Sequence, residues 1–291
     1  MRFRLPKIIK RLFLGVGLLL ICFHLTPSCQ QFRMSASEID EYFRDEAVKP
    51  RLLNMQIEGR NIHYAFMDTP QKPLVVFVHG APGSLSAFID YLKNPSLQQQ
   101  VGMISIDRPG YGDSDFGQEE ASLSKQAFYI SEIIKRHLHG QKVVLVGHSL
   151  GAPIVAKVAL DFPDLVHGLI LVAGSIDPIQ EKNEWYRPLG RGLLGKMLLP
   201  NSLWVTNEEI YFLKDELEAL KPFWQQIDVP VTVIHGTEDK LVPKENVEFA
   251  QKMIPPQYLN VWLEEGVNHF IPWNRPDLII KAIELHTQGD N

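Results

Sequence analysis

One serine of this chain stands in a setting that could make it a nucleophile. It is the third residue of the pentapeptide GHSLG at 147–151. The pattern G-x-S-x-G places a serine on a tight strand-to-helix turn, where the flanking glycines leave room for a strained backbone. The apolar run Val143–Val146 predicts a buried strand before it, and residues 150–162 predict a helix with one apolar face after it. Ser149 is therefore the candidate nucleophile.

Eight stretches of the chain predict the strands that would position this serine. Residues 53–58 and 62–67, on either side of a short polar turn, predict an antiparallel hairpin. Further apolar runs alternate with helical patterns, which indicates βαβ units and a mostly parallel sheet in a core formed by residues 51–176 and 229–288. These runs are 73–78, 101–106, 143–147, 169–173, 231–234 and 258–263. In such sheets, functional side chains gather at the carboxyl ends of the strands.

A long interval separates the sixth and seventh predicted strands. Residues 177–228 far exceed the usual connection of about 2–6 residues, and they predict a helical cap. The cap is rich in aromatic side chains, which we expect to line an apolar substrate pocket above Ser149. The candidates are Trp185, Trp204, Tyr211 and Phe212.

The first 28 residues form a targeting segment. Five basic residues between positions 2 and 11 precede 14 mostly apolar residues at 12–25, which are the proportions of a secretory signal. A membrane-spanning helix needs about 20 apolar residues. We predict that residues 1–28 are a signal peptide or a membrane anchor, and that residues 29–50 are a polar lead-in with a helix starting near Ser37.

Residues 25–29, LTPSC, resemble the lipobox of bacterial lipoproteins, in which the cysteine becomes the lipidated N-terminus. That motif usually has leucine three residues before the cysteine, whereas here Thr26 occupies that position and Leu25 comes one position earlier. Cys29 is thus a candidate for lipidation, and the expected location is the cell envelope of a bacterium, membrane-anchored or periplasmic. The other cysteine, Cys22, lies in the targeting segment, so the chain after Cys29 has no cysteine and can hold no internal disulfide.

The charge balance argues against nucleic acid as a partner. The whole chain has a net charge of −5, and removing residues 1–28, which carry five basic and no acidic residues, leaves −10. An acidic domain repels nucleic acid and anionic lipid surfaces. We expect a small-molecule partner, with contact to the membrane only through the N-terminal anchor or a lipid.

Five motifs together resemble the α/β-hydrolase fold family, in its branch of small capped serine hydrolases and esterases. They are HGAPG at 79–83, DRPGYGDS at 107–114, GHSLG at 147–151, HGTEDKLVP at 235–243 and GVNHF at 266–270. The resemblance covers about residues 50–285. It implies an α/β fold in which a mostly parallel eight-stranded sheet is flanked by helices, with a helical cap inserted after the sixth strand.

The resemblance also implies a catalytic triad in the chain order Ser149, Asp239, His269. A serine hydroxyl needs a base to take its proton, and the family places that base, here His269, after the last strand. Asp239 follows an earlier strand and would orient the histidine. Asp177, which follows the strand before that one, is the rival for this role.

Two backbone N–H groups are implied as donors to the oxyanion of the reaction, those of Leu150 and Ala81. Pro82 cannot serve because proline has no backbone N–H. Neither a metal nor an organic cofactor is implied.

Carboxylic-ester hydrolysis of small or medium apolar substrates through an acyl-enzyme is the leading functional hypothesis. HGAPG suggests an alternative, an aminopeptidase similar to prolyl iminopeptidases, which would hold a substrate ammonium with cap carboxylates. The available carboxylates are Glu181, Glu184, Glu208 and Glu209. Hydrolysis of a carbon–carbon bond or a lactone, a lipase whose cap contacts lipid through residues 193–199, and a ligand-binding relative with vestigial hydrolysis are further alternatives.

Overall fold

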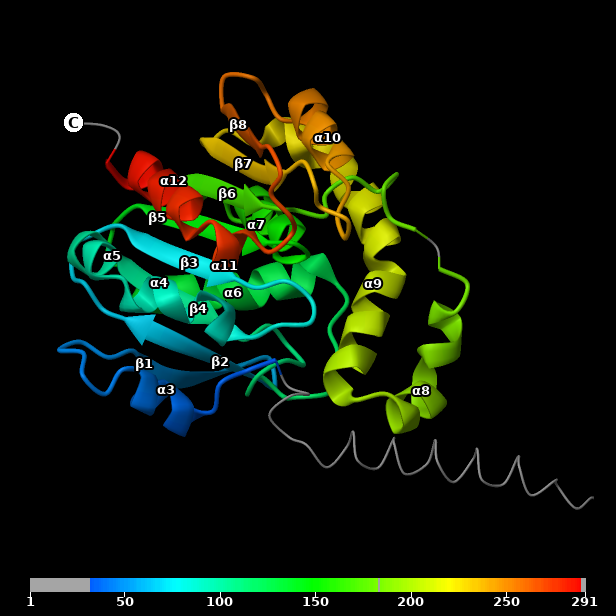
Figure 1. Ribbon diagram of the computed structural model, residues 1–291, viewed down its shortest axis with the longest axis horizontal. Coiled ribbons are helices and arrows are strands. Elements are labelled where there is room, and N and C mark those ends of the chain that lie inside the picture. Colours follow the sequence, from blue (N-terminus) through cyan, green and yellow to red (C-terminus); the bar gives the residue numbers. More distant parts are fainter. Residues whose placement is uncertain (1–31, 183, 289–291) are drawn as a thin grey trace, which may run out of the picture.

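The structure, a computed structural model, describes residues 32–182 and 184–288. These residues form one sheet between two layers of helices (Figure 1). The targeting segment 1–28 and Cys29 lie outside the described residues. Within the part of the chain that is described, no helix has both the length and the apolar character needed to cross a membrane.

The sheet has eight strands in the order β1-β2-β4-β3-β5-β6-β7-β8. The β1–β2 and β2–β4 pairs are antiparallel, and the other pairs are parallel. The strands are β1 Arg51–Ile57, β2 Arg60–Met67, β3 Leu74–Val78, β4 Gly102–Ile106, β5 Val143–His148, β6 Gly168–Val172, β7 Val231–Gly236 and β8 Leu259–Glu264. Each coincides within a few residues with a stretch expected from the sequence, and the predicted fold class is confirmed.

Helices cover both faces of the sheet because side chains of the central strands are apolar in both directions. In β3, Val76 and Val78 belong to the core beneath α6, α7 and α10, whereas Val75 and Phe77 belong to the core beneath α3, α4, α5 and α12. Alternate residues of a strand point to opposite faces. The helices of these layers are α3 Ala36–Tyr42, α4 Ile89–Lys93, α5 Pro95–Gln100, α6 Leu123–His137, α7 Gly151–Asp161, α10 Glu245–Met253, α11 Ile271–Asn274 and α12 Pro276–Gln288.

The lead-in helix α3 begins two residues earlier than the sequence suggested, with Ser35 as its N-cap. The Ser35 hydroxyl accepts a hydrogen bond from the backbone N–H of Glu38 at 3.3 Å, and the Glu38 carboxylate accepts one from the N–H of Ser35 at 2.6 Å. This reciprocal capping box satisfies two donors that an uncapped helix would leave unpaired. Ile39 and Phe43 are buried and pack the lead-in against the sheet.

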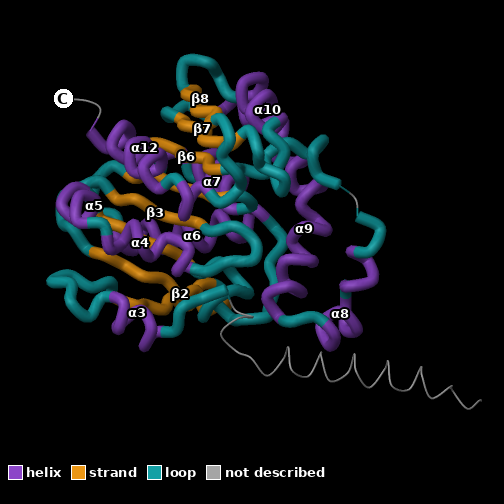
Figure 2. The backbone as a smooth tube through the Cα atoms, in the orientation of Figure 1, coloured by secondary structure: helices purple, strands orange, loops and turns teal. Residues whose placement is uncertain are grey.

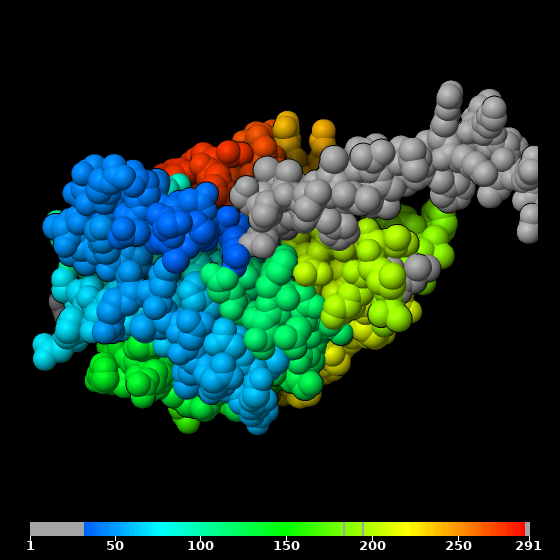
Figure 3. All heavy atoms as spheres, turned by 90° about the horizontal axis from the view of Figure 1, so that it is seen from below, coloured from blue at the N-terminus to red at the C-terminus, as the bar shows by residue number. Residues whose placement is uncertain are grey.

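A helical cap follows the sixth strand, as predicted. It consists of η3 Arg187–Gly190, α8 Gly192–Leu198, α9 Asn201–Leu220 and η4 Lys221–Gln226. Figure 2 shows α8 and α9 beyond one end of the sheet, and in Figure 3 the yellow-green surface of the cap lies away from the blue surface of the N-terminal hairpin. Leu213, Leu217 and Leu220 bury one side of α9 in the main core, so the cap is packed onto the sheet layers.

Candidate active site

Ser149 sits between β5 and α7 with a backbone φ of +54°. This left-handed conformation is uncommon for a residue with a side chain and is typical of a strained functional turn. Hydrogen bonds hold it: the Ser149 N–H donates to the Val172 carbonyl at 2.9 Å, and the Ser149 carbonyl accepts from the Ala152 N–H at 3.0 Å.

The glycines of this turn are required by close backbone approach. A Cβ on Gly147 would lie 2.4 Å from the Gly151 carbonyl oxygen, and a Cβ on Gly151 would lie 2.3 Å from the Val78 carbonyl oxygen. Gly80 faces the serine itself, because a Cβ there would lie 2.8 Å from the Ser149 Cβ. The turn therefore presses the serine against the end of β3.

His269 and Asp239 are joined by a hydrogen bond of 2.7 Å between Nδ1 and Oδ2. His269 lies in the loop between β8 and α11, Asp239 follows β7, and both side chains are buried. His269 lines the same cavity as Ser149. With Nδ1–H donated to the carboxylate, the Nε2 atom is the ring nitrogen left to accept a proton.

The Asp239 carboxylate is oriented by three donors. Besides His269, the backbone N–H groups of Leu241 and Val242 donate to Oδ1 at 2.9 and 2.8 Å. Burial by itself raises the pKa of Asp239, but these hydrogen bonds and the adjacent His269 outweigh it and hold the pKa below its ordinary value. The carboxylate is thus ionised at neutral pH.

The loops that carry this pair are tied together by the backbone. The N–H of Thr237 donates to the Glu264 carbonyl, and that of Glu238 to the Val267 carbonyl, both at 3.0 Å. Gly236 permits the approach, since a Cβ there would lie 2.0 Å from the Val267 carbonyl oxygen. Two segments about thirty residues apart in sequence are held at hydrogen-bonding distance in this way.

Asp177, the rival acid, has other partners. Its N–H donates to the Asn246 side chain at 2.8 Å, and its own carboxylate accepts from the Ile179 N–H at 3.0 Å. The structure places Asp239, and not Asp177, against His269.

The ring of His148 packs against that of His269, with the ring centroids 4.8 Å apart. The Nε2–H of His148 donates to the carbonyl of His269 at 3.1 Å. Burial is the main cause that lowers the pKa of His148 to about 3, and the neighbouring His269 contributes a smaller part. His148 is therefore a neutral support for the His269 loop.

The two predicted oxyanion donors belong to segments next to Ser149. Leu150 is the N-cap of α7, where backbone N–H groups have no carbonyl within the helix to bond. Ala81, in the loop after β3, lines both cavities that contain Ser149. Donors from a helix N-terminus and an adjacent loop suit an oxyanion.

A buried arginine, which the sequence analysis did not single out, braces the loop of Ala81. Arg108 donates from Nε to the His79 carbonyl at 2.9 Å and from Nη2 to the Gly80 carbonyl at 3.0 Å. Its guanidinium also forms a bidentate pair with Glu209 of α9, at 2.5 and 3.1 Å. The sequence offered only the position of Arg108 in a strand-end turn as a signal, and it indicated Glu209 as a cap carboxylate but not as the partner of Arg108.

Three carboxylates proposed for an aminopeptidase are held by arginines. Glu209 pairs with Arg108, Glu208 with Arg191, and Glu184 with Arg187. Glu181 instead accepts a hydrogen bond from the Ser175 hydroxyl, and burial raises the pKa of its carboxyl. Only Glu181 and Glu184 line a cavity with Ser149.

The aromatic residues proposed for the substrate pocket are not at Ser149, which corrects that prediction. Trp204 is buried against Tyr111. Tyr211 and Phe212 pack on the Arg191 guanidinium, which lies 3.8 and 4.6 Å from their ring centroids, and the side chain of Trp185 is 81% exposed. The cap contributes Leu203, Ile210 and Leu213 to the cavities instead. The rotation of α9 about its axis determines which of its side chains face the cavities, and the aromatic content of the segment does not.

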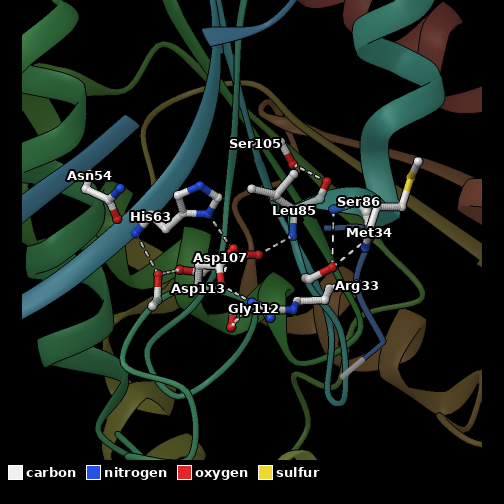
Figure 4. A network of polar contacts seen from close by, with 12 residues as sticks. Arg33, Met34, Asn54, His63, Leu85, Ser86, Ser105, Asp107, Gly112 and Asp113 are labelled. Atoms are coloured by element: carbon white, nitrogen blue, oxygen red, sulfur yellow. Dashed lines mark hydrogen bonds and ion pairs between the residues drawn. The ribbon is translucent and has the colours of Figure 1, made fainter. Parts of the chain in front are cut away.

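A second polar network links β2, the loop after β4 and the lead-in (Figure 4). His63, Asp107 and Asp113 approach closely enough to suggest a metal site among the described residues. The Asp107 carboxylate, however, already accepts from His63 at 2.7 Å, from the Leu85 N–H at 2.7 Å and from the Asp113 N–H at 2.9 Å. Its acceptor positions are satisfied by the protein.

The same network fixes the start of the lead-in. Arg33 donates to the Gly112 carbonyl at 3.0 Å and pairs with Asp113, and the N–H of Met34 donates to the Ser86 hydroxyl at 3.3 Å (Figure 4). Phe32, immediately before, lines the larger cavity at Ser149. The network thus attaches the lead-in to loops beside the site.

Comparisons with known proteins agree with this architecture. Residues 73–198 match the family model described as the alpha/beta hydrolase fold. The chain has the alpha/beta-hydrolase fold. It is 24% identical over 277 residues to the uncharacterized hydrolase YugF of Bacillus subtilis (strain 168), covering 82% of this chain and 98% of that protein. It is 23% identical over 282 residues to a provisionally named esterase/lipase of Haemophilus influenzae, covering 84% and 92%.

Solved structures show the same hydrolase fold. A membrane phospholipase A described as a bacterial virulence factor superposes with a TM-score of 0.65 at 18% identity, over 96% of this chain and 98% of that chain. An E-2-(acetamidomethylene)succinate hydrolase superposes with a TM-score of 0.64 at 20% identity, over 82% and 100%. The family and the named relatives support hydrolase activity as the general assignment.

Proposed function

We propose that the chain is a serine hydrolase that cleaves carboxylic esters through an acyl-enzyme on Ser149. The observation that carries the proposal is the hydrogen bond of 2.7 Å between His269 and the buried Asp239 carboxylate, at a cavity that Ser149 also lines. A strained serine, an oriented histidine and a buried carboxylate are the parts that nucleophilic catalysis of this kind requires.

The first half-reaction forms the acyl-enzyme. The Ser149 Oγ attacks the ester carbonyl carbon while His269 Nε2 accepts the hydroxyl proton, and the carbonyl electrons move to the oxygen. The N–H groups of Ala81 and Leu150 donate to that oxyanion. Its collapse breaks the ester C–O bond, and the leaving alcohol takes the proton from His269. Asp239, ionised throughout, stabilises the transient imidazolium.

Water completes the cycle. His269 takes a proton from a water molecule, whose oxygen attacks the acyl carbon, and the second tetrahedral intermediate collapses to release the acid and return the proton to Ser149 Oγ. The larger cavity at Ser149, of about 630 Å³, has the size of a small-molecule site. It suits esters of small or medium apolar acids.

A p-nitrophenyl ester series from acetate to palmitate tests the proposal, using the chain from Gln30 onward. Wild type should hydrolyse the esters with an optimum at short or medium chain length, and Ser149→Ala should lose at least about 10³-fold in kcat. A fluorophosphonate should label Ser149, as mass spectrometry of the peptide would show. Turnover that persists in Ser149→Ala would overturn the assignment.

We also propose that the N-terminal segment exports the chain to the cell envelope of a bacterium and keeps it at the membrane, through the anchor or through a lipid on Cys29. The basic and apolar pattern of residues 1–28 supports this. Fractionation of wild type and Cys29→Ala, with palmitate labelling, tests it. Labelling in both forms would exclude Cys29, and a soluble cytoplasmic chain would exclude export.

A further inference from the structure

Ser149 lies where two cavities of different character meet. One has a volume of about 630 Å³ and the other about 340 Å³. Four residues line both of them: Ala81, Ser149, Leu241 and His269. An ester carbonyl placed at Ser149 would therefore direct its acyl half into one cavity and its alcohol half into the other.

The larger cavity is lined mainly by apolar side chains. They come from five separate parts of the chain, namely the lead-in, the segment after β3, the cap, the loop after β7 and the region around α11. They include Phe32, Ala87, Leu203, Leu241, Phe270 and Trp273. Such a lining stabilises a hydrocarbon chain by removing it from water.

The smaller cavity is rich in charge. Among its lining residues are three cations, Lys182, Arg187 and Lys240, and two carboxylates, Glu181 and Glu184. Arg187 and Glu184 neutralise each other in a salt bridge. Glu181 accepts a hydrogen bond from the Ser175 hydroxyl, and burial raises the pKa of its carboxyl.

With three cations against two carboxylates, the lining of this cavity carries a net positive charge. Lys182 and Lys240 are exposed, and over residues 32–182 and 184–288 neither one forms a salt bridge with a carboxylate. Lys182 precedes the cap helices, whereas Lys240 adjoins the triad acid Asp239. Two ammonium groups from different segments thus border one cavity beside the candidate nucleophile.

We infer that the smaller cavity is a subsite for an anionic group, and that the substrate is an amphiphilic ester with an apolar chain on one side of the scissile bond and a phosphate or carboxylate on the other. This inference rests on the proposed function, because it places an ester at Ser149. Lys182 and Lys240 bind the anion through charge-assisted hydrogen bonds. The apolar chain occupies the larger cavity.

The test compares esters that share one chain and differ in the charge of the polar half. One series consists of 1-decanoyl-glycerol 3-phosphate, 1-decanoylglycerol and decanoylcholine, all below their critical micelle concentrations, with released decanoate as the readout. A reversed pair, decyl hydrogen succinate and decyl butyrate, places the anion on the acyl side and is followed by release of decanol. In at least one series, kcat/KM for the anionic ester should exceed that for the neutral ester about three- to tenfold.

Variants locate the effect. In Lys182→Ala and Lys240→Ala, the ratio of kcat/KM for the anionic ester to that for the neutral ester should fall about three- to tenfold. Lys244→Ala removes the same charge from the same loop region, outside both cavities, and should leave the ratio within about twofold. High salt should lower the ratio in wild type toward one.

The possible outcomes separate the two proposals. If no ester is cleaved, the proposed function fails. If anionic and neutral esters are cleaved equally in both series, or if decanoylcholine is preferred, ester hydrolysis stands and the anionic subsite is overturned. An equal change of the ratio in Lys244→Ala would also overturn it, because a general field of the surface would then be the cause.

Discussion

Arg108 and Glu209 form a bidentate ion pair inside the protein, with both side chains at most 1% exposed. Arg108 follows β4 and Glu209 belongs to cap helix α9, 101 residues later in the chain. The hydroxyl of Tyr111 at 2.7 Å and the amide of Gln126 at 3.0 Å complete the shell of the carboxylate. Since Arg108 also holds the carbonyls of His79 and Gly80, this pair joins the cap to the loop that carries Ala81.

Glu209→Ala should lower the free energy of unfolding by about 3–5 kcal/mol, because it leaves the Arg108 charge buried without a counterion. Urea denaturation followed by circular dichroism measures the change. Glu218→Ala is the matched control on the same helix, since Glu218 is half exposed and lies 3.9 Å from Lys221; it should cost less than about 1 kcal/mol. Similar losses in the two variants would contradict the buried pair as the dominant contact.

Asp239→Asn should reduce kcat for the best p-nitrophenyl ester about 10⁴-fold, because an amide neither fixes the His269 tautomer nor stabilises the imidazolium. Asp177→Asn should reduce it less than about tenfold, because Asp177 bonds within its own turn. Both variants are compared at equal folded fraction, judged by their thermal transitions. A larger loss in Asp177→Asn would transfer the role of the acid to that residue.

Gly236→Ala should impair activity and stability together, since its Cβ would press on the Val267 carbonyl and separate the loops of Asp239 and His269. We expect a loss of about 3 kcal/mol or more in unfolding free energy. In Gly102→Ala, also in a strand, the nearest atom to the new Cβ lies at an ordinary 3.5 Å. That control should change the free energy by no more than about 1 kcal/mol, and the idea fails if both glycines tolerate alanine equally.

Acid should destabilise the fold through His286, a partly buried histidine beside Thr232. Burial lowers the pKa of His286 to about 4, whereas an unfolded histidine has a pKa of about 6.5. Between these values the unfolded chain binds a proton that the folded chain does not, so the free energy of unfolding falls as pH falls. From pH 7 to pH 5 this one group should account for about 1–2 kcal/mol.

The variant His286→Gln should remove that part of the pH dependence, as urea titrations at pH 7 and pH 5 would show. His139→Gln, at an exposed position, should leave the dependence as in wild type. Parallel losses in wild type and His286→Gln would show that other groups carry the effect.

The sequence by itself determined the sheet and the points where it carries polar side chains. Short, uninterrupted apolar runs of β-branched residues such as Val143–Val146 favour buried strands, and glycine-containing turns mark where those strands end. Glycine is required at positions 147 and 151 for a local reason, because the turn leaves no room for a Cβ at either position. The resemblance to the α/β-hydrolase family implied the roles of Ser149, Asp239 and His269, and each of these residues follows a strand of the sheet.

Only the tertiary structure decided which side chains meet across the cap. The helical character of α9 follows from its composition, but its rotation is set by packing of Leu213 and Leu217 on the core. That rotation buries Trp204 and Glu209 and leaves Phe212 at the surface. Neither residue spacing nor aromatic content encodes such an angle, because it depends on contacts between segments far apart in the chain.

The two cavities at Ser149 are likewise decided only by the tertiary structure. Phe32 and Trp273, at opposite ends of the chain, line one of them, and Lys182 and Lys240 border the other. Each residue alone is unremarkable for its segment. Their opposite polarity around one serine arises because folding places the ends of distant segments at one edge of the sheet.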